Sequence, residues 1–287
     1  MNSTSRRIFQ LLKPLSPLVL EPLTAVALTA NSLGVQYFLA GATARDLVLE
    51  NIFGRPPGKL TRDLDFGFVL SDWKQFENLK AALISTGRFK PDRAIQRILY
   101  QHSAGISIRV DLIPFGGVQE GSQISWPPDN DFVMNVAGFR EALESAIQVQ
   151  VDGDLVVPVA SLPGLIILKL FAWADRKHEK RDAPDILKIL TDYADAGNED
   201  RLYADELPIL KASEFDVPMA GAQLLGKDAR HIASQETSAS IEKMLSNPDL
   251  KQELINQIVQ TSPRSDESFA DRCARLLDNF QSGFTEG

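Results

Sequence analysis

The chain has few of the residues that mark several common classes of protein. It has one cysteine, Cys273, in 287 residues, which excludes an internal disulfide framework and predicts an inert thiol on the last helix. No apolar run reaches the roughly 18 residues of a membrane span, and the start, Met1–Arg7, does not fit a signal peptide. We therefore expect a cytoplasmic protein with no membrane partner.

Other absences concern chemistry. The three histidines are scattered, and the sequence has no zinc-protease motif, no nucleophile elbow and no dinucleotide-binding fingerprint. The segment Gly54–Leu60 resembles a phosphate-binding P-loop, but it has three residues between the glycines where four are needed. Two prolines also remove backbone donors, so we interpret this segment as an ordinary loop.

Net charge is −8, from 30 basic and 38 acidic residues, which argues against a protein that coats nucleic acid non-specifically. The acidity is uneven, because residues 191–287 hold nine basic and 18 acidic side chains. The rest of the chain is therefore close to neutral. Apolar residues make up 44 % and charged residues 24 %, which is typical of a globular protein of one large or two modest domains.

Hydrophobic periodicity changes along the chain, from mixed strands and helices to helices alone. We expect an α/β domain over residues 1–160 and a helical domain over residues 161–287. The predicted strands span residues 35–40, 63–70, 95–102, 106–115 and 152–158, with a small hairpin before the last. The predicted helices span residues 22–33, 42–53, 72–85, 161–173, 182–194, 215–234, 238–245, 248–259 and 265–280.

Paired aspartates form the strongest local feature, in the segment Arg62–Phe66. On a strand, Asp63 and Asp65 project from one face about 7 Å apart, while Leu64 and Phe66 enter the core. Two carboxylates on one face repel each other unless a cation lies between them, and Mg²⁺ favours oxygen ligands of this kind. The alternative is a solvated strand edge with two harmless charges.

A third carboxylate, Asp111, lies in the otherwise apolar stretch 106–115. Ionised carboxylates are seldom buried without a partner or a metal. If this strand lies beside residues 63–70, three acids on adjacent strands could hold two Mg²⁺ ions for phosphoryl or nucleotidyl transfer. The alternative is an ion pair between Asp111 and Arg109, two residues back on the same face.

A glycine, Gly41, separates a predicted strand from a predicted helix. Such a turn exposes backbone N–H groups to which phosphates bind readily. The order of this glycine, the helix, the paired aspartates and the later aspartate resembles the polymerase-β-like nucleotidyltransferase superfamily. The residue patterns of Ala40–Asp46 and Thr61–Phe66 are similar to those of the AbiEii/AbiGii toxins of type IV toxin–antitoxin systems. The pair Arg45–Asp46 also resembles the corresponding residues of CCA-adding and poly(A) enzymes.

A second block, Lys169–Ile186, resembles the Lys-x-x-Ala…Arg…Arg-Asp-x-x-Asp motif of the same toxin family, so that the resemblance covers about residues 37–190. It departs from the pattern at Ala42, where the superfamily usually has glycine or serine, and in a longer gap before Asp63. The extra residues lie in the Gly54–Lys59 loop, which we expect to be a substrate-contacting flap. For Asp182, the alternative to a functional role is helix capping.

The resemblance implies a nucleotidyltransferase-type mixed sheet, an NTP substrate and two Mg²⁺ ions. The implied metal ligands are Asp63, Asp65 and Asp111, and the implied catalytic residues are these three with Lys169 and Asp182. The implied nucleotide-binding residues are Gly41, Ala42, Thr43, Arg45, Lys169, Arg176 and Asp185.

Three hypotheses of function follow. In the first, an NMP is transferred from an NTP to an RNA, such as the 3′ end of a tRNA, by a toxin that has a cognate antitoxin protein. In the second, the acceptor is a small cationic molecule resembling an aminoglycoside, attracted by the acidic residues 191–287. In the third, the chain binds nucleotide or a partner protein without catalysis, which the alanine at position 42 would favour.

Overall fold

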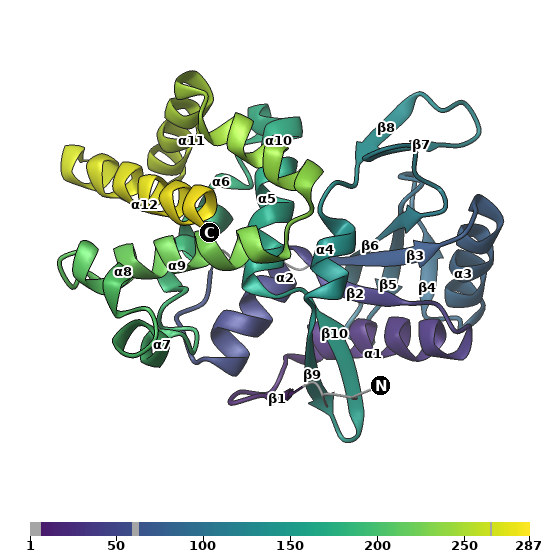
Figure 1. The fold of residues 1–287 in the computed structure, drawn as a ribbon. Coiled ribbons are helices and arrows are strands. Elements are labelled where there is room, and N and C mark those ends of the chain that lie inside the picture. Colours follow the sequence, from purple (N-terminus) through teal and green to yellow (C-terminus); the bar gives the residue numbers. More distant parts are fainter. Residues whose placement is uncertain (1–6, 59–62, 265) are drawn as a thin grey trace, which may run out of the picture. The chain divides into compact units, whose positions relative to one another are not determined.

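The computed structural model describes residues 7–58, 63–264 and 266–287. The chain divides into two compact units (Figure 1). The first unit comprises Met1–Gly54 and Leu60–Ser161, and the second comprises Arg55–Lys59 and Leu162–Gly287. The segment Arg55–Lys59 thus groups with the second unit, whereas our sequence-based division left it in the first domain. The mixed α/β class and the helical carboxy-terminal region are confirmed.

The first unit is built on an eight-stranded sheet with the order β1-β9-β10-β2-β3-β6-β5-β4. Its strands are β1 (Ile8–Gln10), β2 (Tyr37–Ala40), β3 (Leu64–Leu70), β4 (Phe89–Pro91), β5 (Arg97–Gln101), β6 (Ser107–Gly116), β9 (Ile147–Asp152) and β10 (Leu155–Val159). Strand β3 pairs parallel with β6 and antiparallel with β2, so the sheet is mixed as predicted. A separate hairpin joins β7 (Gln123–Trp126) to β8 (Phe132–Asn135).

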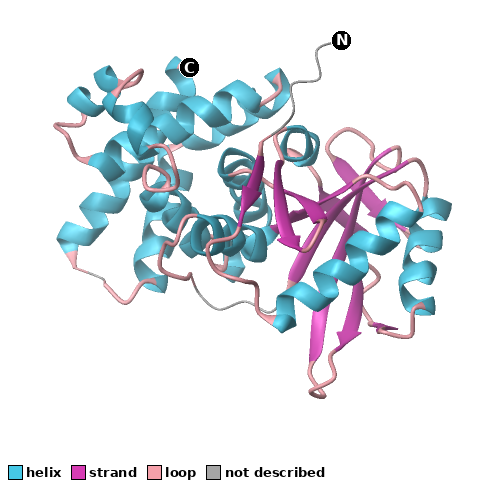
Figure 2. Ribbon diagram, turned by 90° about the horizontal axis from the view of Figure 1, so that it is seen from below, coloured by secondary structure: helices cyan, strands magenta, loops and turns pink. Residues whose placement is uncertain are grey.

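Helices pack against both faces of this sheet. The helical elements of the first unit are α1 (Pro17–Ser32), α2 (Gly41–Asp46), the π-helical turn η1 (Leu47–Ile52), α3 (Trp73–Ser85) and α4 (Phe139–Glu144). Helices α1 and α3 contact each other and the sheet, and Figure 2 shows helices crossing the magenta strands. Alternate residues of β3, namely Leu64, Phe66 and Phe68, are fully buried on one side, as the period of a strand requires. The residues between them are therefore directed to the opposite face.

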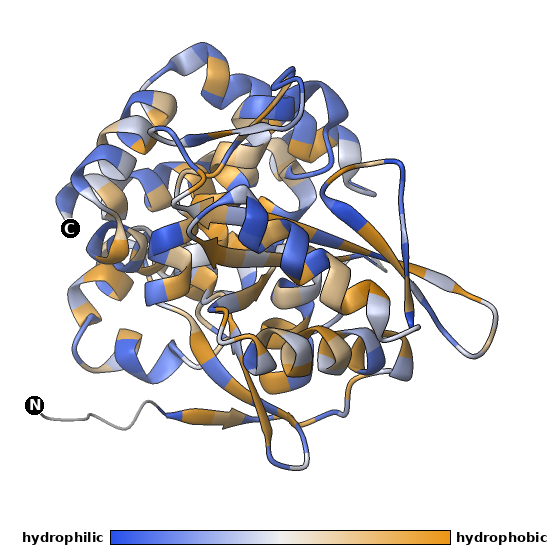
Figure 3. Cartoon of the chain, turned by 90° about the vertical axis from the view of Figure 1, so that its right-hand side faces the viewer, coloured by the Kyte–Doolittle hydropathy of each residue, from blue (hydrophilic) through white to orange (hydrophobic). Residues whose placement is uncertain are grey.

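The second unit is helical. Its elements are α5 (Leu162–Arg176), η2 (Lys177–Glu179), α6 (Ala183–Asp192), α7 (Glu199–Tyr203), α8 (Leu207–Ala212), α9 (Val217–Ile232), α10 (Gln235–Leu245), α11 (Pro248–Thr261) and α12 (Glu267–Glu286). Hydrophilic and hydrophobic residues alternate along the helices in Figure 3, as expected where one face of each helix is buried. Helices α9 and α12 touch backbone to backbone, since a Cβ on Gly283 would lie 1.9 Å from the carbonyl oxygen of Gln223.

Several predicted boundaries are wrong. Helix α1 begins at Pro17, because a proline is tolerated at the first helical position, and it carries Pro22 inside it. The predicted strand over residues 152–158 is instead the end of β9, a turn at Gly153 with φ of +47°, and most of β10. The short elements β1, β4, β7, β8, α4, α7 and α8 were not predicted. Three to six residues hold too little periodicity to show above the background.

No helix in the described part of the chain is both long enough and apolar enough to cross a membrane. This finding concerns residues 7–58, 63–264 and 266–287 alone.

The thiol of Cys273 is expected to be unreactive in the folded protein. The residue is 1 % exposed, and burial raises the pKa of the thiol to about 11, so little of the reactive thiolate exists at pH 7. A thiol-modifying reagent should react with the native protein at least about tenfold more slowly than with the urea-unfolded protein. Equal rates of modification in the two states would contradict this expectation.

Candidate active site

A glycine turn lies directly against one of the paired aspartates. Strand β2 ends at Ala40 and α2 begins at Gly41, where φ is +69°. A Cβ built on Gly41 would lie 1.9 Å from Oδ2 of Asp65, closer than any real contact. Only glycine therefore allows the Asp65 carboxylate to sit against the start of α2. The structure brings the predicted phosphate-binding turn and the carboxylate together.

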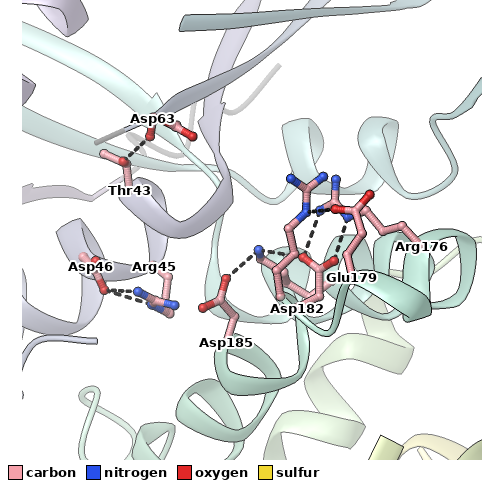
Figure 4. Close-up of polar contacts among 10 residues, drawn as sticks. Thr43, Arg45, Asp46, Asp63, Arg176, Glu179, Asp182 and Asp185 are labelled. Carbon is pink, nitrogen blue, oxygen red and sulfur yellow. Dashed lines mark hydrogen bonds and ion pairs between the residues drawn. The ribbon is translucent and has the colours of Figure 1, made fainter. Parts of the chain in front are cut away.

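Threonine 43 connects the same helix to the strand that carries the aspartates. The Thr43 hydroxyl donates to the backbone carbonyl of Asp63 at 2.7 Å, and the side chain is buried (Figure 4). Arg45 is 1 % exposed and donates from Nε and Nη2 to Oδ1 of Asp46 at 2.9 and 2.6 Å. Thr43 and Arg45 thus lie inside the turn and hold its shape, while Gly41 and Ala42 form its rim.

Two of the three aspartates lie on adjacent strands, and the third, Asp63, directly precedes the first of these strands. Asp65 of β3 and Asp111 of β6 are register partners in the parallel pair, so the condition set for a cluster of three acids, that these strands are neighbours, is met. Leu64 and Phe66 are fully buried, which directs Asp63 and Asp65 to the other side of β3. Residues Arg62 and Thr61 of the same motif lie outside the described residues.

Two arginines bind carboxylates of this group. Arg97 of β5 binds Asp111 in a bidentate pair, with Nε 2.6 Å from Oδ1 and Nη2 2.9 Å from Oδ2. Arg109 donates from Nε to Oδ1 of Asp63 at 2.9 Å. The alternative pairing of Asp111 with Arg109 is therefore wrong, because each arginine binds the carboxylate facing it from a neighbouring strand.

The sequence analysis did not identify Arg97 as a site residue, although the predicted hairpin could have indicated its position opposite Asp111. The hairpin with its turn at Ala104–Gly105 sets the register, and that register places Arg97 opposite Asp111. The hydrogen bonds to Asp111 raise the pKa of Arg97 and outweigh the opposing effect of burial. The guanidinium is charged at any physiological pH.

The donor chemistry of this face suits a hard divalent cation, since carboxylate oxygens on adjacent strands are the ligands that Mg²⁺ prefers. Among the described residues, however, no group of three or more His, Cys, Asp or Glu side chains is arranged as a metal site. Asp63 and Asp111 face guanidinium groups that already balance their charge. The residue types fit the ion, and a bound ion would compete with these guanidiniums for the carboxylate oxygens.

A second charged cluster lies within the second unit. Lys169 of α5 places Nζ 3.1 Å from Oδ1 of Asp182 and 2.6 Å from Oδ2 of Asp185. Figure 4 labels the two aspartates. Arg176 also binds Asp182, with Nε 2.7 Å from Oδ2 and Nη2 2.9 Å from Oδ1. Asp182 precedes α6 but caps it with no side-chain hydrogen bond, so the capping alternative is wrong.

Asp182 is 2 % exposed, and burial alone would raise the pKa of its carboxyl. The hydrogen bond from Arg176 and the charge of Lys169 outweigh burial, so the pKa is lowered instead. The four predicted residues of this motif therefore come together in one network of ion pairs.

The loop expected to form a substrate flap is held on the second unit. Arg55 lies 2.7 Å from Asp195 and 3.9 Å from Asp192, both on the helical side. Its continuation, residues 59–62, lies outside the described part of the chain. A contact with substrate stays a prediction.

A mixed sheet with a glycine turn beside paired aspartates defines a nucleotidyltransferase. The family model "Nucleotidyl transferase AbiEii toxin, Type IV TA system" matches residues 25–275. The chain belongs to this family.

Known structures with a similar arrangement are distant. An antigenic nucleotidyltransferase-like protein from Paracoccidioides brasiliensis is 19 % identical, with 72 % of this chain and 95 % of that chain covered and a TM-score of 0.40. The lincomycin-bound lincosamide antibiotic adenylyltransferase LnuA is 14 % identical, with 54 % and 86 % covered and a TM-score of 0.33. The Thermotoga maritima CCA-adding enzyme complexed with tRNA is 10 % identical, with 96 % and 82 % covered and a TM-score of 0.26. A comparison with curated proteins finds no match.

Proposed function

We propose that this nucleotidyltransferase transfers an NMP from an NTP to the 3′ end of an RNA such as a tRNA, with Mg²⁺, as the toxin of a toxin–antitoxin or phage-defence system. The observation that carries the proposal is the position of Gly41, whose missing side chain places the Asp65 carboxylate against the turn. Asp111 is the register partner of Asp65 on the next strand. Phosphate-binding backbone and metal-binding carboxylates are thus adjacent.

Each predicted site residue of the first unit has a role in this proposal. Asp63, Asp65 and Asp111 would hold two Mg²⁺ ions, which, when bound, neutralise the triphosphate and polarise its α-phosphorus. Backbone N–H groups at Gly41 and Ala42 bind phosphate oxygens, with no side-chain hydroxyl at Ala42 to assist. Asp111 accepts the proton of the acceptor hydroxyl, whose oxygen bonds to the α-phosphorus as the bond to pyrophosphate breaks. Thr43 and Arg45 position the turn.

For the second unit, we propose that Lys169 and Arg176 bind phosphate oxygens of the NTP. Asp182 and Asp185 bind the Lys169 ammonium, and Asp182 also binds Arg176, so these carboxylates orient the cations. A supply of NTP and RNA is the reason to propose the cytoplasm as the place of action. A cognate antitoxin is the proposed partner, as the family description implies.

The test is transfer of label from each α-labelled NTP to total RNA in the presence of Mg²⁺. We expect the wild type to label RNA and Asp65→Asn to lower the rate about a thousandfold. Asp154→Asn, which removes an exposed charge in the β9–β10 turn of the same unit, is the matched control. Label that enters only cationic small acceptors would favour the second hypothesis, and Mg²⁺-dependent NTP binding without pyrophosphate release would favour the third.

A further inference from the structure

The face of the sheet that carries the aspartates continues beyond them with basic residues. Across β4, β5 and β6, Lys90, Leu99 and Arg109 are register partners. Arg97 and Asp111 form the next row of the same face. Lys90 is exposed, and the side chain of Arg109 is 54 % exposed. We call the three basic residues of these two neighbouring register rows, Lys90, Arg97 and Arg109, the basic row.

The order of the strands separates the two ends of this face. The Gly41 turn follows β2, the paired aspartates lie at the start of β3, with Asp63 directly before it, and the basic row begins on β6 and ends on β4. With about 4.8 Å between strands, β3 and β4 lie roughly 14 Å apart. Triphosphate at the turn would thus leave the basic row for another ligand.

Two members of the row bind the carboxylates that the proposed metal needs. Arg97 binds Asp111 at 2.6 and 2.9 Å, and Arg109 binds Asp63 at 2.9 Å. A carboxylate shared by a divalent cation and a guanidinium would bring like charges together. A metal on Asp63 and Asp111 would therefore compete with both guanidiniums, and a guanidinium that it displaces requires another anion.

We propose that Lys90, Arg97 and Arg109 bind the phosphodiester backbone of a single-stranded RNA acceptor, and that metal binding releases the two arginines for this contact. The inference rests on the proposed function, since it assigns the acceptor's binding surface. All three residues belong to the first unit. A polycationic acceptor is disfavoured, because the released row would repel it. Divalent metal and RNA therefore bind with positive linkage.

The experiment measures two equilibria without NTP. Mn²⁺ binding is followed by titration calorimetry, and binding of a single-stranded oligoribonucleotide by fluorescence anisotropy, with and without Mg²⁺. In the wild type, Mg²⁺ should strengthen RNA binding. In the double variant Arg97→Gln, Arg109→Gln, Mn²⁺ should bind at least as tightly as in the wild type, because its competitors are gone. RNA binding with Mg²⁺ should weaken roughly tenfold or more.

Lys90→Gln provides a variant that leaves the arginine pairs intact. It should weaken RNA binding and reduce the salt slope by about 0.7, with unchanged Mn²⁺ affinity. Lys74→Gln removes an exposed positive charge on α3 and is the matched control, expected to bind RNA as the wild type does. Thermal unfolding of each variant shows that it is folded.

Three results would overturn the proposal. These are Mg²⁺ failing to strengthen RNA binding by the wild type, weaker Mn²⁺ binding by the folded double variant, or an equal loss of RNA affinity in Lys74→Gln. Because no NTP is present, these results are independent of transfer. If the wild type bound RNA with this linkage but transferred no NMP, the proposed function would be refuted, and the proposal that the basic row binds RNA would remain supported.

Discussion

Replacing Gly41 with alanine is expected to lower NMP transfer at least about a hundredfold while leaving the protein folded. The new Cβ would lie 1.9 Å from Oδ2 and 2.8 Å from Cγ of Asp65, so the carboxylate or the turn must move by more than an ångström. A displacement of that size at a carboxylate that we propose to bind metal would remove the geometry that an in-line displacement needs. The measurement is the rate of label transfer at saturating NTP.

The control separates the steric clash from backbone strain. Gly34 has a φ of +65°, close to the +69° of Gly41, but a Cβ on Gly34 would meet nothing within 4 Å. Both alanine variants therefore carry the same strain of about 1–2 kcal/mol, and only Gly41→Ala adds the collision. If Gly34→Ala lost as much activity as Gly41→Ala, the position of Asp65 against the turn would not be the cause.

Replacing Asp182 with asparagine is expected to lower the free energy of unfolding of the chain by about 3 kcal/mol. The Asp182 carboxylate is 2 % exposed and binds both Lys169 and Arg176, so its neutral isostere leaves buried positive charge with one carboxylate, Asp185, in place of two. Urea unfolding monitored by fluorescence measures the loss. Glu179→Gln, which breaks an exposed pair with Arg181, is the control and should cost less than about 1 kcal/mol.

The same carboxyl predicts how stability depends on pH. Its pKa is lowered on folding, so its contribution is present above the unfolded value of about 3.9 and is lost as pH falls through the lower folded value. Wild type should therefore lose stability below about pH 4 more steeply than Asp182→Asn, which has no such proton to take up. Parallel stability curves from pH 6 to pH 3 would show that the pair does not stabilise the fold.

The local sequence pattern was sufficient to predict which side chains of a strand are buried, because successive side chains of a strand point to opposite faces. Alternation in residues 63–70 correctly separated the buried Leu64 and Phe66 from the aspartates. The apolar run around Asp111 correctly predicted the strand β6, and the structure meets the condition that this strand lies beside β3. The short strands β1 and β4 escaped prediction because three residues are held by their neighbours in the sheet, not by their own periodicity.

The counter-ions were harder to predict than the carboxylates. Arg109 is two residues from Asp111, yet it binds Asp63, and Arg97 reaches Asp111 from β5. Similarly, Asp182 stands where a helix cap would be expected, but its carboxylate binds Lys169 and Arg176. Each choice depends on which charged group the packed backbone brings within about 3 Å, since ion pairing falls steeply with distance and exposure.

The sequence by itself determined the class of this protein, because the glycine turn, the paired aspartates and the later Lys169–Ile186 block are linear motifs whose spacing survives without coordinates. It also excluded disulfides, since one cysteine cannot pair within the chain. Only the tertiary structure decided that Asp65 rests against Gly41 and that arginines from neighbouring strands bind Asp63 and Asp111. Those contacts join residues that are distant along the chain, and the register of the sheet, which no single segment encodes, brings them together.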